Sequence, residues 1–165
     1  MRLLIKQKVF SLTDSFNVYD ENENIKYTVK GEFFSLGKKL HVYDASGNEL
    51  GMVRQKILTL LPMFFIEING VEVGTISKGF SFFKDNYEVD YKGWDVRGDW
   101  FDWDYEVYRG DYKVLDIQTK LLSWGDTYIV DVKNNEDELA ALMLVLAIDA
   151  VNDAKRASSS ASSSS

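Results

Sequence analysis

The sequence contains no cysteine and only one histidine, His41, among its 165 residues. The absence of cysteine excludes disulfide bonds, thiolate zinc sites and a cysteine nucleophile. A metal site could use at most one imidazole, and a Ser-His-Asp triad would need His41 without any G-x-S-x-G motif. No pair of carboxylates stands out for acid–base chemistry. We therefore predict a protein that is not an enzyme and holds no metal or other cofactor.

Long apolar runs are also missing. The N-terminal segment from Met1 to Lys6 has only three consecutive apolar residues, too few for the core of a signal peptide. No stretch approaches the roughly 18 uninterrupted apolar residues of a membrane span. The sequence therefore predicts a cytoplasmic protein without a transmembrane segment, and it leaves peripheral contact with a membrane open.

Positive charge is scarce overall, since 19 Lys and Arg stand against 26 Asp and Glu, for a net charge of −7. This balance argues against nucleic-acid binding. The charge is uneven: residues 1–56 contain nine Lys or Arg against seven Asp or Glu, whereas residues 85–138 contain six against fifteen. Such asymmetry fits one specialised face, and it fits ordinary variation on a solvated surface equally well.

Apolar and polar residues alternate from residue 7 to residue 133, with turn signals every eight to twelve residues. Asn69 and Gly70 suit a two-residue type I′ turn, because both tolerate positive φ. Residues 20–24 resemble the start of a calcium loop, but Ile25 stands where glycine is required, so they indicate a hairpin turn. This pattern predicts about twelve short antiparallel strands in a sandwich or barrel.

The chain also contains an internal repeat. Residues 27–34 (YTVKGEFF) match residues 94–101 (WDVRGDWF), and two further pairs of segments match in the same order. These pairs are residues 40–43 with 105–108 and residues 64–68 with 128–132. The matches predict a duplicated unit, with two similar half-sheets of about six strands each.

The pattern changes near residue 134. Asn134 is a suitable N-cap, and residues 136–138 place acidic side chains in the first helical turn. Residues 139–148 (LAALMLVLAI) then predict a helix that is apolar on every side and must be surrounded by protein. A closed barrel of about twelve strands could enclose it. We predict one domain over residues 1–156 and a disordered Ser/Ala tail over residues 157–165.

This order of motifs resembles the LURP-one-related family, whose bacterial members are similar to the tubby C-terminal domain and to phospholipid scramblases. The resemblance is carried by residues 16–20 (FNVYD), 27–31 (YTVKG), 40–44 (LHVYD), 53–56 (VRQK) and 139–148. It implies a mainly β, twelve-stranded antiparallel barrel, internally duplicated and filled by the helix. Tubby relatives bind phosphoinositide headgroups through basic residues on the outside of the barrel, whereas the bacterial branch has no established activity to carry over to this chain. Scramblase relatives have cysteine-rich and membrane-inserting segments that this chain lacks.

Basic side chains are expected together on one outer face of the first half-repeat. If Val29, Leu40, Val53 and Ile57 face the core, their strand neighbours face outward. The outward basic residues are then Lys26, Lys30, Lys39, His41, Arg54 and Lys56. Near an anionic membrane, each is worth roughly 1 kcal/mol of attraction to phosphate or lipid headgroups. An ordinary solvated strand face, on which lysines discourage edge pairing, explains the same pattern.

Two other functions stay open. Acidic and aromatic residues alternate over residues 94–106, which could form a protein-interaction surface around Trp100 to Trp103. The simpler interpretation places the aromatic side chains inward and the acids in water. An enzyme acting on a small ligand in the mouth of the barrel is the third alternative. We therefore predict a binding or scaffold module whose partner is anionic membrane lipid or another protein.

Overall fold

The structure is a computed structural model, and it describes residues 1–6, 15–32, 36–78, 87–99, 103–122 and 125–162. These residues form twelve strands, one short 3₁₀ helix and one α-helix. The elements are β1 (Arg2–Ile5), β2 (Ser15–Tyr19), β3 (Ile25–Gly31), β4 (Lys39–Asp44), β5 (Glu49–Gln55), β6 (Met63–Ile68), β7 (Val71–Lys78), β8 (Tyr87–Tyr91), β9 (Asp95–Asp99), β10 (Asp104–Arg109), β11 (Tyr112–Leu122), β12 (Gly125–Val132), η1 (Asn135–Asp137) and α1 (Glu138–Ser162).

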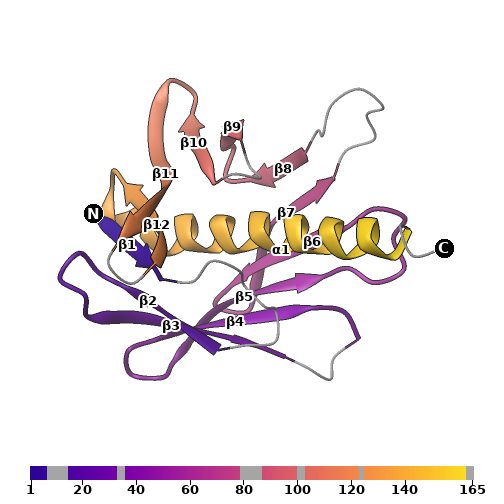
Figure 1. Cartoon of the computed structure of the whole chain (residues 1–165), viewed down its shortest axis with the longest axis horizontal. Helices are drawn as coiled ribbons and strands as arrows, with labels where there is room; N and C mark the ends of the chain where they lie inside the picture. Colours follow the sequence, from indigo (N-terminus) through magenta and orange to yellow (C-terminus); the bar gives the residue numbers. More distant parts are fainter. Residues whose placement is uncertain (7–14, 33–35, 79–86, 100–102, 123–124, 163–165) are drawn as a thin grey trace.

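All twelve strands belong to one antiparallel sheet, with the order β8-β7-β6-β5-β4-β3-β2-β1-β12-β11-β10-β9. The sheet curls around α1, which runs through its middle (Figure 1). In the described part of the chain, β8 and β9 form no ladder with each other. The barrel is therefore nearly closed, and the predicted twelve-stranded antiparallel barrel around a C-terminal helix is confirmed. Most residues of β9 are exposed, so little apolar surface draws this strand toward the helix.

The predicted duplication agrees with the strand pairing. The matched segments of the repeat lie on β3 and β9, on β4 and β10, and on β6 and β12. The first half, β1 to β6, is a continuous six-stranded meander, whereas the second half forms two hydrogen-bonded groups, β7–β8 and β9–β12. The halves join where β1 pairs with β12 and where β6 pairs with β7. The opening between β8 and β9 corresponds to the ladder of β2 and β3 in the first half. The two halves therefore differ mainly where the barrel stays open.

The predicted turns form where the local sequence allows them. Asn69 and Gly70 have φ values of 51° and 74°, as a type I′ hairpin between β6 and β7 requires. Between β2 and β3, the Asp20 carboxylate accepts hydrogen bonds from the backbone N–H groups of Asn22 and Asn24, both at 2.9 Å. Residues 20–24 are thus a hairpin turn held by an aspartate side chain, as predicted.

The start of α1 also follows the prediction. The side chain of Asn134 accepts a hydrogen bond of 3.2 Å from the backbone N–H of Glu136 and caps the 3₁₀ turn that leads into α1. Asp137 and Glu138 lie at the positive end of the helix dipole, which favours negative charge.

The apolar segment of α1 lies in the centre of the barrel. Every residue from Ala140 to Ile148 is at most 5% exposed, and Leu142, Leu144 and Leu146 are fully buried. Burying each leucine is worth about 1.5–3 kcal/mol, so this segment is a large part of the core. The predicted central helix is confirmed. No helix in the described ranges combines the length and apolar content needed to cross a bilayer.

The helix continues past the predicted start of the tail. The structure keeps residues 157–162 helical, whereas the sequence predicted disorder from residue 157. The Ser158 and Ser159 hydroxyls donate hydrogen bonds to the backbone carbonyls of Lys155 and Arg156, at 2.8 and 3.0 Å. These bonds satisfy the serine hydroxyls within the helix, which is how serine is accommodated outside the core.

Candidate functional site

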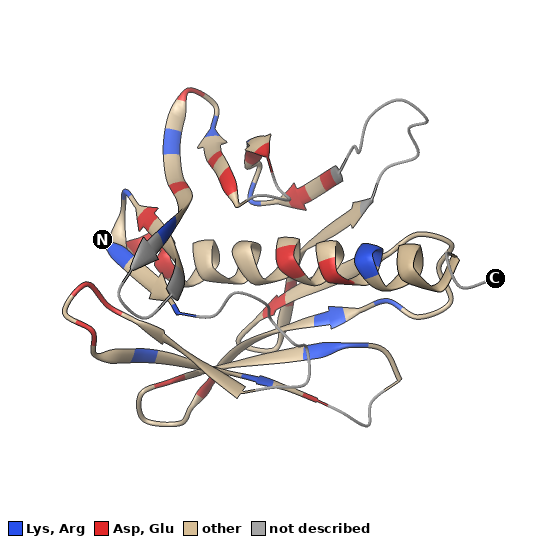
Figure 2. Ribbon diagram, in the orientation of Figure 1, with Lys and Arg blue, Asp and Glu red and all other residues tan. Residues whose placement is uncertain are grey.

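Five of the six predicted basic residues lie on one outer face of the first half-barrel. Strand pairing places Lys30 beside His41, and Lys39 beside Arg54. Lys56 follows the end of β5, next to Arg54. The alternate residues of these strands, including Val29, Leu40, Val42 and Val53, are buried, which confirms the predicted orientation. The Lys and Arg positions of β4 and β5 lie in the half of the molecule toward which α1 runs to its C-terminal end (Figure 2). We call this surface the basic face, and it comprises Lys30, Lys39, His41, Arg54 and Lys56.

Glutamates alternate with the cations on the basic face. Lys39 forms an ion pair with Glu32 at 3.2 Å, and the His41 ring nitrogens lie 3.1 Å from Glu49 and 3.3 Å from Glu32. Hydrogen bonds from Lys39 and then His41 lower the pKa of the Glu32 carboxyl below its ordinary value. The Glu32 carboxylate therefore competes with any external anion for the side chains of Lys39 and His41.

Arg54 is held most firmly of the five. Its Nε donates to Glu67 and its Nη2 to Glu72, the latter at 3.0 Å. Its guanidinium also lies over the ring of Phe65, with 4.2 Å between Cζ and the ring centroid. These contacts fix the orientation of Arg54 and use much of its hydrogen-bonding capacity.

Lys30 and Lys56 differ from these residues because neither ammonium has a carboxylate partner within the described residues. Lys30 lies over the ring of Tyr43, 5.0 Å from the centroid, and Lys56 lies 5.8 Å from the centroid of Phe65. Both side chains are exposed. Their charges are available to an external anion at little cost, since a cation–π contact at an exposed site is worth only about 0.5–1 kcal/mol.

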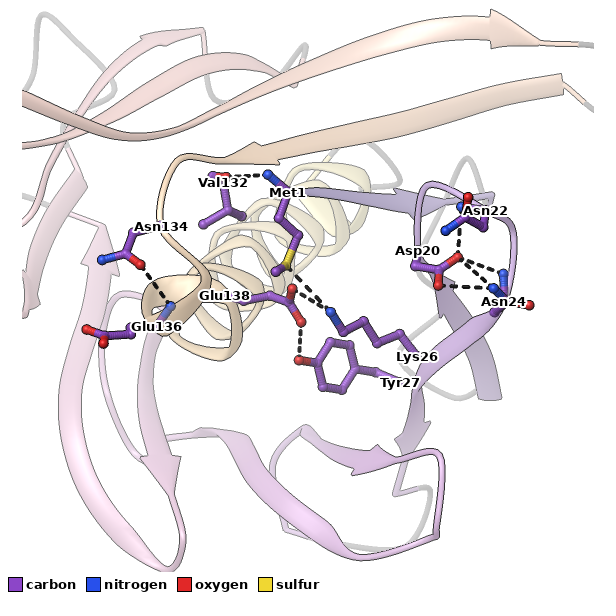
Figure 3. Close-up of polar contacts among 10 residues, drawn as sticks. All are labelled: Met1, Asp20, Asn22, Asn24, Lys26, Tyr27, Val132, Asn134, Glu136 and Glu138. Atoms are coloured by element: carbon purple, nitrogen blue, oxygen red, sulfur yellow. Dashed lines mark hydrogen bonds and ion pairs between the residues drawn. The ribbon is translucent and has the colours of Figure 1, made fainter.

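Lys26 does not belong to the basic face. Its Nζ lies 2.7 Å from Glu138 at the start of α1 and 3.5 Å from the Met1 sulfur, at the opposite end of the barrel (Figure 3). The Tyr27 hydroxyl donates to the same carboxylate. Burial, and then the bond to Glu138, raises the pKa of Tyr27 above its ordinary value. The prediction that Lys26 joins the other cations on an outward face was wrong, because a buried glutamate draws its side chain toward the helix.

Within residues 94–106, the described aromatic side chains mostly face inward, as the simpler interpretation of this acidic and aromatic segment predicted. Trp103 is 5% exposed and stacks on Tyr128, with ring centroids 4.0 Å apart. Trp100 lies outside the described residues. Acidic positions are numerous along β8–β12, as the red segments of Figure 2 show. A protein-interaction surface on these strands stays a prediction, and Trp103 does not contribute an exposed ring to it.

Sequence reasoning missed an apolar loop. Ile57 was expected inward beside Val53, but β5 ends at Gln55 and Ile57 is 47% exposed. Residues 56–62 connect β5 to β6 beside the C-terminal part of α1, and an open pocket of about 480 Å³ lies between them. The signal was present in the sequence, because residues 57–61 (ILTLL) break the alternation immediately after Lys56.

Asp149 is a second feature that the sequence reasoning did not identify. It is 2% exposed, and its Oδ2 has no hydrogen-bond partner among the described residues. Burial is the main cause of a strongly raised pKa for this carboxyl. In the same described part of the chain, no three His, Cys, Asp or Glu side chains gather in a way that could hold a metal ion.

The fold and its surface define a class of protein, namely an internally duplicated, nearly closed antiparallel barrel built around its own C-terminal helix. The family model described as LURP-one-related matches residues 1–149. The chain is also 34% identical over 151 residues to the uncharacterised protein YxjI of Bacillus subtilis (strain 168), covering 92% of this chain and 93% of that protein. The chain belongs to the LURP-one-related family, which confirms the resemblance inferred from its motifs.

A solved structure shares the fold. The X-ray structure of a protein from Arabidopsis thaliana superimposes with a TM-score of 0.57 at 20% sequence identity, over 90% of this chain and 89% of that chain. At this identity the similarity shows a common architecture alone. The function therefore has to be argued from the surface of this chain.

Proposed function

We propose that this domain is a non-enzymatic binding module of the cytoplasm that contacts anionic phospholipid headgroups peripherally through the basic face. One observation carries the proposal. Strand pairing collects Lys30, Lys39, His41 and Arg54 on neighbouring strands, and Lys56 follows the end of β5. Lys30 and Lys56 have no carboxylate partner among the described residues. Two available ammonium groups on one face suit phosphate oxygens, which are strong hydrogen-bond acceptors.

The glutamates on the basic face determine how strongly we expect it to bind lipid headgroups. Glu32, Glu49, Glu67 and Glu72 already contact Lys39, His41 and Arg54. A headgroup phosphate would have to compete with these carboxylates, so binding is expected to be weak and to depend on several lipids at once. It is also expected to fall with added salt, because exposed charges are screened beyond a Debye length of about 8–10 Å near physiological ionic strength.

Co-sedimentation with vesicles tests the proposal. The chain is mixed with vesicles of phosphatidylcholine and phosphatidylglycerol, at about two to one, and with vesicles of phosphatidylcholine alone. We expect binding to the anionic vesicles only. The double variant Lys30→Glu with Lys56→Glu should weaken binding by at least about tenfold, given roughly 1 kcal/mol for each basic side chain.

The matched control reverses two charges elsewhere. Lys92 and Lys120 are exposed residues of the second half-barrel, and replacing both by glutamate changes the net charge equally. We expect this control to bind nearly as well as the unmodified chain. Equal losses in the two double variants would show that net charge alone governs binding, and absence of binding to anionic vesicles would refute the proposal.

A further inference from the structure

Two neighbouring connections expose large apolar side chains at one end of the barrel. In the β5–β6 loop, Leu58 is 100% exposed, Leu60 is 93% exposed and Ile57 is 47% exposed. In the β3–β4 connection, Leu36 is 86% exposed. The connections adjoin, because a Cβ atom placed on Gly37 would lie 3.0 Å from Cγ2 of Ile57. Four exposed aliphatic residues thus lie on two adjoining connections, and we call this surface the apolar tip: Leu36, Ile57, Leu58 and Leu60.

The fold does not require the apolar tip. In the second half-repeat, β11 continues to Leu122 and pairs it with Gly125 of β12, so the corresponding hairpin is short. In the first half, β5 stops at Gln55 and β6 begins only at Met63. Leu58 also has a φ of 60°, an unfavourable conformation for a bulky residue. An extra apolar loop with a strained leucine at full exposure is a feature without a role in the core.

Cations flank the apolar tip, and the loop itself has no acidic residue between positions 56 and 62. Lys56 begins the loop, and Lys155 of α1 lines the same pocket as the loop residues. Lys38 follows Gly37 and forms an ion pair of 2.7 Å with Asp153. The exposed leucines therefore have Lys56 and Lys155 as neighbours around one pocket, and the basic face adjoins the loop through Lys56.

We infer that the apolar tip inserts among the acyl chains of an anionic membrane while Lys56 and Lys155 remain at the headgroup level. This inference rests on the proposed function and adds an orientation to it, with the barrel standing on the end where α1 finishes. Lysine stems can lie along the apolar layer while their ammonium groups reach phosphate. A membrane fits better than a protein groove, because the leucines project from two separate connections and the β5–β6 loop has a lysine, Lys56, and no acidic residue.

The absence of cysteine allows a direct test. The variant Leu58→Cys is labelled with an environment-sensitive fluorophore and mixed with the phosphatidylcholine and phosphatidylglycerol vesicles. We expect a blue shift of the emission and quenching by spin labels attached to the acyl chains. The control, Ser46→Cys in the exposed turn between β4 and β5, should show neither change.

A second arm measures affinity. The double variant Leu58→Ser with Leu60→Ser removes two exposed side chains, so the fold should be unaffected, which circular dichroism and urea unfolding check. We expect its partition onto the anionic vesicles to fall by about tenfold or more, because each leucine that enters the acyl layer contributes favourable transfer free energy to binding. The Lys92→Glu with Lys120→Glu control should keep its partition.

The outcomes separate the two proposals. If the unmodified chain binds anionic vesicles but the fluorophore at position 58 stays in water, insertion is refuted and headgroup binding stands. If the fluorophore enters the acyl region while Lys30→Glu with Lys56→Glu has no effect, insertion of the leucines stands, and headgroup contact by the basic face, including Lys56, is refuted. Self-association of the chain without vesicles, abolished by Leu58→Ser with Leu60→Ser, would overturn insertion and identify the tip as an interface between copies.

Discussion

Lys26 of β3 and Glu138 at the start of α1 form an ion pair of 2.7 Å across 112 positions of the chain. The Glu138 side chain is 5% exposed, whereas that of Lys26 is 35% exposed. Tyr27 donates to the same carboxylate. The first half of the barrel is thus tied to the beginning of the helix through one buried acid.

This arrangement predicts unequal effects of the two partners on stability. Lys26→Met leaves a buried carboxylate without its cation and should lower the free energy of unfolding by about 3 kcal/mol. Glu138→Gln should cost about 1 kcal/mol, because Lys26 can turn toward water. Urea unfolding at neutral pH measures both. Lys120→Met, at an exposed position, should change stability by less than about 0.5 kcal/mol. The reverse order for Lys26 and Glu138 would contradict the described burial.

The central helix gives a second prediction. Leu144 is fully buried, so Leu144→Asp would place an unpaired charge in the core and should prevent folding. The milder Leu144→Ala should cost about 2–5 kcal/mol through lost burial and a cavity. Ala157→Asp, at an exposed position of the same helix, serves as the control and should fold normally. A native-like circular dichroism spectrum and cooperative unfolding for Leu144→Asp would disprove central burial.

Asp149 gives a prediction about pH. Because burial raises the pKa of its carboxyl in the folded state, the folded chain binds this proton more tightly than the unfolded chain does. The contribution of Asp149 to stability should therefore fall as pH rises from about 3.9, the pKa of an unperturbed aspartate, through its raised folded value. Asp149→Asn should remove this dependence of the free energy of unfolding on pH. It should also stabilise the domain at neutral pH by about 1–2 kcal/mol.

The neighbouring Asp153 is the control for Asp149. Asp153 pairs with Lys38 at 2.7 Å and is partly exposed, so Asp153→Asn should not stabilise the domain. The measurement is urea unfolding of the three chains between about pH 4 and pH 8, around the unperturbed aspartate value. If the free energies of unfolding of the unmodified chain and of Asp149→Asn changed with pH in parallel, Asp149 would not be a buried carboxyl with a raised pKa.

Gly51 provides a prediction about the packing of β5 against α1. A Cβ atom on Gly51 would lie 2.6 Å from the backbone oxygen of Glu67 and 3.0 Å from Cε of Met143 in α1. The backbone oxygen cannot move as a side chain can, so Gly51→Ala should destabilise the domain by about 1–3 kcal/mol. Thermal or urea unfolding measures the loss. An unchanged stability would indicate a looser contact between β5 and α1.

The sequence predicted those parts of the fold that depend on local pattern. Alternation in β3, β4 and β5 placed Val29, Leu40 and Val53 inward and the basic residues outward, and the continuous apolar run identified the buried helix. The repeat matched strands to strands. These features follow from the period of two in strands and from the need to bury a helix that is apolar on all sides.

The partners of the basic residues could not be predicted in the same way. Glu72 reaches Arg54 from β7, and Glu138 reaches Lys26 from the far end of the chain, so these contacts depend on strand order and barrel closure. Ile57 was placed inward by extending the alternation beyond Gln55, where the strand in fact ends. Long-range pairing and strand ends are decided by tertiary structure, and a single sequence carries little information on either.

The central functional claim is a membrane contact that combines charge with apolar insertion, and the partition of the unmodified chain onto vesicles at increasing salt tests it most directly. Screening weakens the charged contacts, whereas burial of leucines persists. We predict strong partition onto phosphatidylcholine and phosphatidylglycerol vesicles at low salt, a fall of about tenfold toward physiological salt, and a residual level that Leu58→Ser with Leu60→Ser abolishes. No partition at low salt, or partition that salt does not change, would contradict the claim.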